Sequence, residues 1–165
     1  MQLTRRFLIA AILAAGLLPF AALAANTSGL PVPRFVSLKS DETNVRTGPG
    51  TRYPIQWVYR RGGMPVEVIE EYDLWRKIRD VEGTTGWVHK GMLGGERNVV
   101  IKGGEARIIK AEPEEDAPGV LKAAPMVHAR LVECEPEWCR IQLSGRKGWI
   151  EKKYLWGVYA GEVFE

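Results

Sequence analysis

Short apolar and alternating segments follow one another from residue 35 onwards, separated by Gly, Pro, Asp and Asn residues. No segment after residue 25 keeps the period of about 3.6 residues that an amphipathic helix requires. Short segments of this kind, with turn signals between them, are typical of the strands of a small all-β domain. We therefore predict strands at 35–38, 56–59, 65–69, 75–78 and 86–89.

The second half of the chain repeats the order of the first half. The sequence VEVIEEYDLWRKI (66–78) aligns without a gap on ARLVECEPEWCRI (129–141). Farther along, GWVHKGML (86–93) aligns on GWIEKKYL (148–155). The repeat period is about 60 residues, which is too long for a solenoid and fits a complete minimal domain.

Upstream of these segments the repeat is weaker. VSLKSDETNVR (36–46) matches VVIKGGEARII (99–109) in pattern more than in identity. The pattern as a whole predicts two tandem domains, 35–94 and 98–159, separated by a connector of a few residues. Because this connector is so short, we expect the two domains to touch and to move little relative to each other.

The N-terminal residues have the features of an export signal. A basic head precedes an apolar run, 7–20, and Ala22-Leu23-Ala24 supplies the small residues that a signal peptidase requires. The alternative is a membrane-spanning helix, which needs about 20 apolar residues, and this run is shorter and contains a proline. We predict a signal peptide over 1–25, cleaved after Ala24 or Ala25, and a leader over 26–34. The protein would then be periplasmic or secreted.

The charge of the chain excludes two classes of partner. The sequence has 23 basic and 20 acidic residues, and removal of Arg5 and Arg6 with the signal peptide lowers the net charge from +3 to +1. Nucleic-acid-binding domains carry a clear basic excess, and proteins held on anionic membranes carry a polybasic cluster. We therefore expect neither nucleic acid nor a stable membrane anchor once the signal peptide is removed.

The first repeat carries a set of landmarks in a fixed order, which are NVRTGPGTRYP (44–54), MPVEVIEEYDLWRKIRD (64–80) and GWVHKGML (86–93). In these it resembles the bacterial SH3-like domains of extracytoplasmic proteins over residues 35–93. The second repeat keeps the later segments but not the loop, and it resembles a diverged copy. The resemblance implies two tandem small SH3-like β-barrels, each strongly bent. It also implies a binding or targeting module for the cell wall or a protein partner.

The loop TNVRTGPGTRYP (43–54) is a candidate either for ligand binding or for a tight turn. A phosphate-binding loop presents successive backbone N–H groups, but the central proline has none and no Gly-Lys-Ser/Thr follows. The flanking glycines can adopt positive φ and reverse the chain. Val45 would anchor the loop inward, and Arg46 has donors enough to bind several loop carbonyls. Ligand contact by Arg46 is the alternative. The residues with a predicted structural role are Asn44, Val45, Arg46, Gly48, Pro49 and Gly50.

Aromatic residues divide into a predicted core set and a predicted surface set. Large rings in the apolar strands of so small a domain are expected to pack in the core, and these are Trp75, Trp87, Trp138 and Trp149. If Val58 points inward, its two aromatic neighbours share the outer face, where flat rings suit an extended peptide or a sugar. The hypothetical ligand-binding set is Arg52, Tyr53, Trp57 and Tyr59.

Two cysteines, Cys134 and Cys139, flank a short segment that looks like a tight turn. Outside the cytoplasm such a pair predicts a disulfide across a hairpin. A zinc site would need four ligands, and only His128 lies nearby. A nucleophilic thiol would need an orienting base, with the same shortage. We predict a disulfide and no metal site.

Catalytic residues are hard to find in this chain. The only histidines are His89 and His128, and neither has a serine or free cysteine signature near it. Paired carboxylates for glycoside cleavage stay open as an alternative. Two domains use nearly the whole chain, so we expect a non-catalytic binding or adaptor protein without a cofactor. Its expected partner is cell-wall peptidoglycan or an envelope protein. The alternatives are a structural subunit of a larger envelope complex, and an accessory to or remnant of a wall hydrolase.

Overall fold

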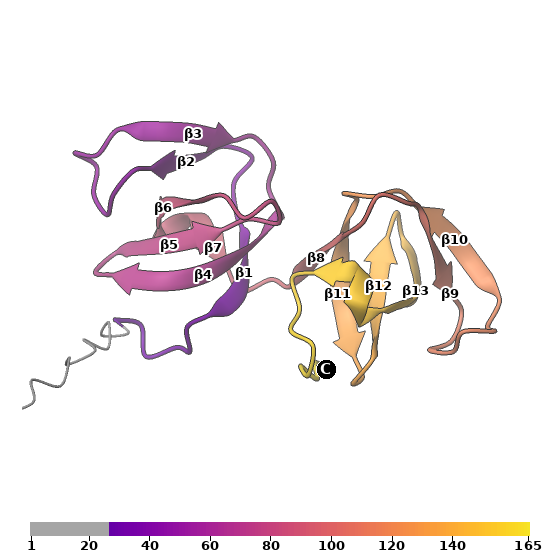
Figure 1. Cartoon of the computed structure of the whole chain (residues 1–165). Helices are drawn as coiled ribbons and strands as arrows, with labels where there is room; N and C mark the ends of the chain where they lie inside the picture. The colour runs from indigo at the N-terminus through magenta and orange to yellow at the C-terminus, as the bar shows by residue number, and fades with distance from the viewer. Residues whose placement is uncertain (1–26) are drawn as a thin grey trace, which may run out of the picture.

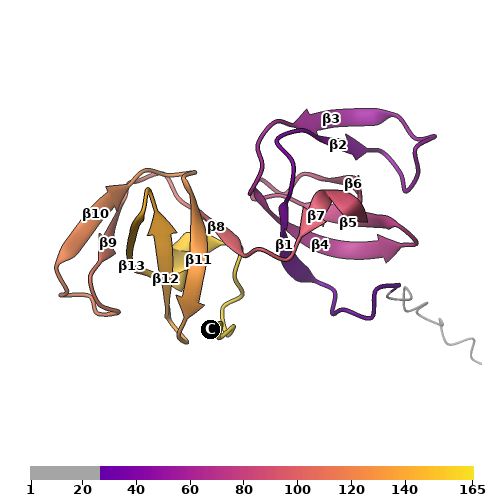
Figure 2. The same ribbon diagram turned by 180° about the vertical axis from the view of Figure 1, so that it is seen from behind.

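The computed structural model describes residues 27–165, which form two antiparallel β-sheets of seven strands each. Figure 1 shows the two resulting domains next to each other, and Figure 2 shows the same pair from behind. The predicted signal peptide and its cleavage site lie outside the described residues. Within 27–165, no helix is long and apolar enough to cross a membrane.

Each domain has seven strands and one 3-10 turn, in the same order along the chain. The first domain consists of β1 (Arg34–Leu38), β2 (Thr43–Arg46), β3 (Ile55–Tyr59), β4 (Pro65–Tyr72), β5 (Trp75–Arg79), β6 (Thr85–His89), η1 (Lys90–Met92) and β7 (Leu93–Gly94). The second consists of β8 (Asn98–Ile101), β9 (Arg107–Lys110), β10 (Gly119–Ala123), β11 (His128–Cys134), β12 (Trp138–Leu143), β13 (Arg146–Glu151), η2 (Lys152–Tyr154) and β14 (Leu155–Trp156).

The two sheets have the same topology. The strand order is β3-β2-β6-β5-β4-β1-β7 in the first and β10-β9-β13-β12-β11-β8-β14 in the second. Each strand of one sheet therefore has a counterpart at the same place in the other. The all-β class and the tandem repeat that the sequence predicts are confirmed.

Each sheet encloses its own apolar core, because alternate strand residues point to the same face. In the first domain the buried cluster consists of Leu38, Val45, Val66, Val68, Ile78 and Val88. In the second domain it consists of Val99, Ile101, Ile109, Ala123, Ala129, Leu131, Cys134, Cys139, Ile141, Ile150, Leu155 and Val158. The second cluster contains both cysteines, and the first cluster contains none.

The pairing of the strands corrects the alignment of the two repeats at one place. The sequence pattern placed Arg46 over Ile109. In the structure, Arg46 pairs with Trp87 and Lys110 pairs with Trp149, so Arg46 corresponds to Lys110. The loop between β8 and β9 is one residue longer than its counterpart, which shifts every later position of β9 by one.

The predicted disulfide between Cys134 and Cys139 is present, and it joins paired positions of β11 and β12. In the first domain the corresponding pair across β4 and β5 is Glu71 and Arg76. These two form an ion pair, with Arg76 Nε 3.1 Å from Glu71 Oε1, and both side chains are buried. A covalent bridge in one domain thus takes the place of a buried ion pair in the other.

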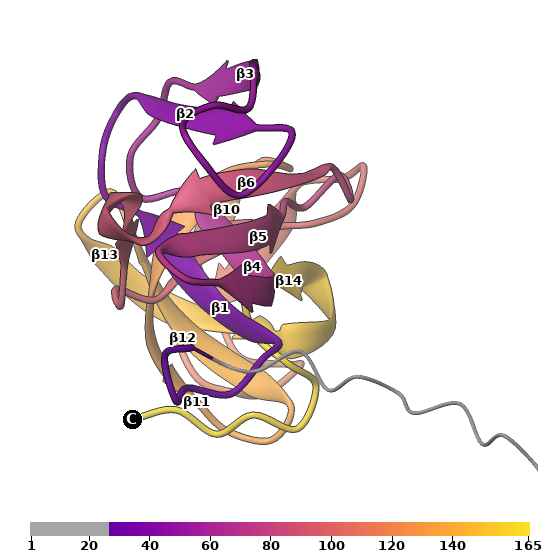
Figure 3. The ribbon, with the colours of Figure 1, turned by 90° about the vertical axis from the view of Figure 1, so that its left-hand side faces the viewer.

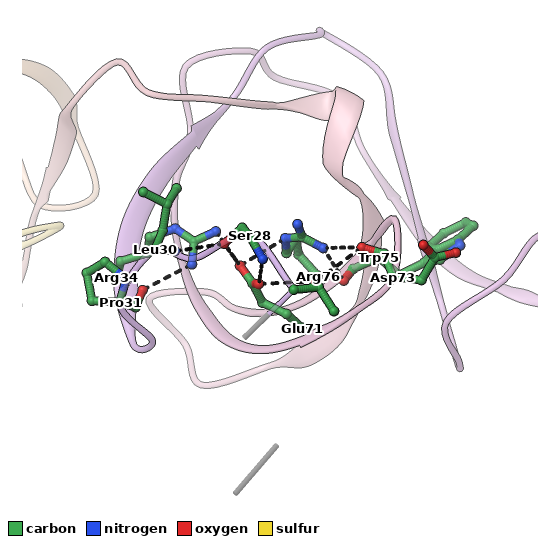
Figure 4. Close-up of polar contacts among 9 residues, drawn as sticks. Ser28, Leu30, Pro31, Arg34, Glu71, Asp73, Trp75 and Arg76 are labelled. Carbon is green, nitrogen blue, oxygen red and sulfur yellow. Dashed lines mark hydrogen bonds and ion pairs between the residues drawn. The ribbon is translucent and has the colours of Figure 1, made fainter. Parts of the chain in front are cut away.

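The leader binds to the same buried carboxylate, as Figure 4 shows. Ser28 donates to Glu71 from its backbone N–H at 2.8 Å and from its hydroxyl at 2.7 Å. Arg34 donates to Glu71 at 2.7 Å through Nη2, and the Thr27 hydroxyl lies 3.3 Å from Glu71 Oε2. A buried carboxylate needs such donors to remain ionised, so the leader is part of the first domain's structure.

The C-terminal segment covers the corresponding hairpin of the second domain. Phe164 and Cys134 exchange backbone hydrogen bonds of 2.6 and 3.2 Å. The ammonium group of Lys152 is buried beneath this segment, where it donates to the carbonyl oxygens of Glu135, Pro136 and Glu162 at 2.7 to 2.8 Å. Burial lowers the pKa of Lys152. The leader therefore packs on the first domain, and the C-terminal segment packs on the second.

The two domains share an interface of aromatic and polar side chains. The ring of Phe35 lies 5.1 Å from that of Trp156 and 4.7 Å from that of Tyr159. The Tyr159 hydroxyl donates to Glu67 Oε1 at 2.9 Å. The predicted contact between the domains is therefore confirmed, and Figure 3 shows the first domain in front of the second along this direction. Their restricted relative motion stays a prediction.

Candidate functional site

The loop between β2 and β3 closes on the guanidinium group of Arg46. Nη1 of Arg46 donates to the carbonyl oxygens of Thr51 at 3.1 Å and Tyr53 at 2.7 Å. The Tyr53 ring packs on Gly48, where a Cβ atom would lie 2.5 Å from the ring. The glycine is therefore required by the close approach of the ring, and Arg46 has the clamping contacts that the sequence analysis expects.

Arg52 and Tyr53, two members of the hypothetical ligand-binding set, lie at the tip of this loop. Nη2 of Arg52 donates to the Tyr53 hydroxyl at 3.3 Å, and its guanidinium lies 5.1 Å from the ring centroid. Arg52 is exposed and Tyr53 half-buried. The role of this tip in ligand binding stays a prediction.

Trp57 and Tyr59, the other two members, face the core of the first domain, so the expectation of a shared outer face is wrong. Both rings pack against the buried cluster and lie edge to face, 6.1 Å apart. The Tyr59 hydroxyl donates to Asp80 Oδ2 at 2.7 Å, and burial raises the pKa of Tyr59. The reason is room, since Gly86 has no side chain and a Cβ atom there would lie 3.2 Å from the Trp57 ring. The four residues do not form one open patch.

The predicted core tryptophans divide into two pairs. Trp87 and Trp149 are buried, each with 8% exposure. Trp75 and Trp138 are only half-buried. Each of this second pair instead forms the wall of a groove at the same place in its domain.

The groove of the first domain has a volume of about 300 Å³ and lies where β2 and its loop approach the ends of β5 and β6. The Trp75 ring meets the His89 ring edge to face, with centroids 5.6 Å apart. Nδ1 of His89 accepts from the Gly91 N–H at 3.2 Å, which fixes the imidazole at the start of η1. The groove is lined by Glu42, Asn44, Arg46, Thr51, Trp75, His89 and Met92.

The groove of the second domain has a volume of about 430 Å³. Its lining residues are Arg107, Ile108, Lys110, Glu115, Asp116, Trp138, Ile150, Glu151 and Tyr154. Six of them occupy the positions that line the first groove, when the strands are matched by their pairing and the loops by their equal length. The corresponding pairs are Asn44 with Ile108, Arg46 with Lys110, Thr51 with Glu115, Trp75 with Trp138, His89 with Glu151, and Met92 with Tyr154.

Two basic groups of the second groove are held by contacts with neighbouring residues. The Arg107 guanidinium lies 4.0 Å from the centroid of the Tyr154 ring, a cation–π contact. Nζ of Lys110 donates to the Ala117 carbonyl at 3.2 Å, as Arg46 binds loop carbonyls in the first domain. Each groove thus offers an indole wall beside fixed polar groups, an arrangement suited to an extended peptide or a sugar. Within 27–165, no three His, Cys, Asp or Glu residues are placed to hold a metal ion.

Sequence reasoning missed both grooves, although part of the signal was available. The gapless alignment already places Trp138 over Trp75, and GWIEKKYL over GWVHKGML. Those two segments supply the tryptophan wall and the turn residues of each groove. The β9 side could not be found in this way, because the repeat is shifted by one residue there.

Comparison with known families assigns both halves of the chain to one group. The family model for the bacterial SH3 domain matches residues 39–95 and again residues 106–157. The chain belongs to the bacterial SH3 domain family. The resemblance seen in the first repeat is confirmed, and the match to the second bacterial SH3 domain extends it to the diverged copy.

Solved structures similar to this bacterial SH3 protein include NlpC1 from Trichomonas vaginalis, at 15% identity, a TM-score of 0.34, and coverage of 82% of this chain and 49% of that chain. An NlpC/P60 family protein from Bacillus cereus ATCC 10987 matches at 14% identity and a TM-score of 0.33, covering 74% and 55%. NlpC2 from Trichomonas vaginalis matches at 13% identity and a TM-score of 0.35, covering 76% and 48%. The chain therefore spans about half the length of these structures. No curated protein matches the chain.

Proposed function

We propose that this chain is an exported, non-catalytic binding protein whose two bacterial SH3 domains recognise cell-wall peptidoglycan. We also take each seven-stranded sheet to be a small SH3-like barrel. The observation that carries the proposal is the repetition of one groove at corresponding positions of both domains, each with a half-buried tryptophan as its wall. An indole wall with neighbouring hydrogen-bonding groups can bind both the sugar and the peptide of such a polymer.

Two linked grooves support binding to a polymer in particular. When one groove is occupied, the second faces a high effective concentration of neighbouring repeats, which raises the overall affinity without any new contact. The contacts of Phe35 with Trp156 and Tyr159 bring the two domains that carry the grooves against each other. A polymer that offers many equivalent sites makes use of this arrangement, whereas a single small molecule does not.

The test uses exposed groove positions, where a substitution does not disturb the core. Asn44 and Ile108 occupy corresponding places in the two grooves, and both are exposed. Asn44→Arg with Ile108→Arg places a long charged side chain in each groove. Ile55→Arg is the matched control, because Ile55 is 48% exposed, as Ile108 is 47% exposed, and lines neither groove. Co-sedimentation with purified peptidoglycan sacculi at low and at physiological salt is the measurement.

We expect the unsubstituted protein and Ile55→Arg to pellet with sacculi, and the double groove variant to lose at least about tenfold in affinity. A contrary result is that the unsubstituted protein fails to pellet and gives one discrete partner after crosslinking in the periplasm. That result would show that the partner is an envelope protein and not peptidoglycan. Release of soluble muropeptides from the sacculi would refute the non-catalytic role. Equal pelleting of all three proteins would show that the grooves do not take part in binding.

A further inference from the structure

The outer face of each sheet has a row of three side chains across neighbouring strands, at corresponding positions in the two domains. In the first domain the row is Phe35 on β1, Glu67 on β4 and Arg79 on β5. Glu67 at its centre is 3% exposed. It accepts from Arg79 Nε at 2.9 Å and from the Tyr159 hydroxyl at 2.9 Å. Both oxygens of this central carboxylate therefore accept hydrogen bonds, one of them from the second domain.

The corresponding row in the second domain is Asn98 on β8, Arg130 on β11 and Gln142 on β12. A cation here takes the central place that a carboxylate has in the first domain. Arg130 is exposed, and within residues 27–165 its side chain makes no ion pair or hydrogen bond. This row thus contains a cation, Arg130, but no carboxylate to pair with it.

The turn between β3 and β4 of the first domain lies over this row. A Cβ atom on Gly63 would lie 3.5 Å from Asn98 Nδ2, so the turn touches β8. Between the domains is a pocket of about 200 Å³, lined by Arg61, Gly62, Gly63, Asn98, His128, Ala129, Arg130, Gln142, Leu143 and Ser144. No Asp or Glu of the described residues lines it.

His128 supplies a second group in this pocket that lacks a partner. Its Nδ1 atom is buried and makes no hydrogen bond within the described part of the chain. Burial first, and then the charge of nearby Arg61, lower the pKa of His128. Arg61 itself is exposed and has no ion pair among residues 27–165. Asp41 accepts from the Gly62 N–H at 3.0 Å but does not line the pocket.

We propose that this pocket between the domains binds a small oxyanion, a phosphate or a carboxylate group, on Arg61 from the first domain and Arg130 from the second. Planar guanidinium groups bind both kinds of anion through paired N–H donors. The amide groups of Asn98 and Gln142 flank Arg130 and complete the polar surroundings, and Nδ2 of Asn98 also donates to Ser37 Oγ at 3.1 Å. An anion here would supply to the second domain the negative charge that Glu67 supplies to the first.

This site is separate from the two grooves and does not depend on the proposed recognition of peptidoglycan. Because one arginine comes from each domain, the bound anion would connect the domains. Phosphate and carboxylate share the chemistry of binding, so the experiment must separate them. A phosphate group would point to a phosphate-bearing polymer or metabolite, and a carboxylate to a peptide or acidic sugar.

The experiment is an NMR titration of the purified exported protein with inorganic phosphate and, separately, with acetate. The readout is the imidazole signal of His128, which His128→Gln identifies against the single other histidine, His89. We expect one of the two anions to shift this signal with saturation and to raise the pKa of His128 by about one unit, because an adjacent anion favours the imidazolium. The anion that binds more tightly indicates the source of the ligand.

Three substitutions separate a built site from general charge attraction. Arg130→Gln and Arg61→Gln should each weaken binding at least about tenfold. Arg140→Gln is the matched control, because Arg140 lies on β12 and pairs with Glu133 at 3.1 Å outside the pocket. It should leave the affinity unchanged. Backbone amide spectra check that each variant remains folded.

Four outcomes would overturn the proposal. One is an imidazole signal of His128 that neither anion moves. Another is a shift that grows linearly without saturation, which would indicate an adventitious ion only. Equal weakening by Arg140→Gln would attribute the effect to overall charge. Loss in Arg130→Gln with no loss in Arg61→Gln would place the anion on the second domain alone and refute the bridging of the domains.

Discussion

Replacing Glu71 by glutamine removes the charge on which the leader and the β4–β5 hairpin both depend. The side chain of Glu71 is fully covered. Burial by itself raises its pKa, but hydrogen bonds from Ser28 and Arg34 and the charge of Arg76 outweigh burial and lower the pKa of Glu71 from 4.5 to about 2. One pKa unit corresponds to about 1.4 kcal/mol, so the ionised carboxylate contributes about 3 kcal/mol to the free energy of unfolding.

The expected result has a definite dependence on pH. Because the pKa of Glu71 is lower in the folded state, its contribution is complete above pH 4.5 and is lost as the pH falls towards 2. We expect Glu71→Gln to lower the free energy of unfolding by about 3 kcal/mol at pH 7. The difference from the unsubstituted protein should shrink to between about 1 and 2 kcal/mol at pH 3. Urea denaturation followed by tryptophan fluorescence at the two pH values measures both quantities.

The neighbouring residue provides the control. Glu70 lies on the same strand and pairs with Lys77 at 3.3 Å, but both side chains are more than a third exposed. Glu70→Gln should therefore cost less than about 0.5 kcal/mol at either pH. Similar losses for the two variants, or a loss in Glu71→Gln that is as large at pH 3 as at pH 7, would refute the reasoning.

Three further predictions concern other parts of the chain. Serine at both Cys134 and Cys139 should lower the free energy of unfolding of the second domain by about 2 kcal/mol, and reducing agent should give the same thermal shift in the unsubstituted protein. Arg46→Ala should cost about 2 kcal/mol in urea denaturation, because two carbonyls lose their donor, whereas Arg52→Ala at the exposed tip should cost less than about 0.5 kcal/mol. Tyr159→Phe removes the hydroxyl bound to a first-domain carboxylate, and we expect a loss of about 1 kcal/mol and more separate unfolding of the domains in calorimetry. A thermal midpoint insensitive to reduction, equal losses for the two arginine variants, or an unchanged calorimetric trace for Tyr159→Phe would contradict them.

The order of the strands and the disulfide could be predicted, because both follow from local pattern. Alternation and turn residues mark each strand, and two cysteines separated by a tight turn have few other uses outside the cytoplasm. The equivalence of Glu71–Arg76 with Cys134–Cys139 was also present in the gapless alignment. An ion pair and a disulfide share no residue type, so the alignment alone does not show that the two pairs take the same place.

The direction of side chains on β3 could not be predicted. The outer placement of Trp57 and Tyr59 depended on Val58 alone, and local alternation does not say which face of a strand is buried. Gly86, which is distant from Trp57 in the sequence, has no side chain and so leaves room for the Trp57 ring. The pairing of β2 and β3 also shifts between Val45 and Arg46, a bulge that changes which residues face the core. Both causes lie in tertiary contacts.

The ring contacts of Phe35 with Trp156 and Tyr159 also have a geometric consequence. They join surfaces near β1 and β14, while the tryptophan walls of the grooves belong to other strands of each sheet. If this interface also restricts the relative motion of the domains, as we predict, it sets a single spacing and a single angle between the two grooves. A polymer that binds both grooves at once would then need repeating units at that spacing. The interface between the domains would therefore select polymers by their repeat length. A longer connector would remove this selection by repeat length while leaving each groove intact.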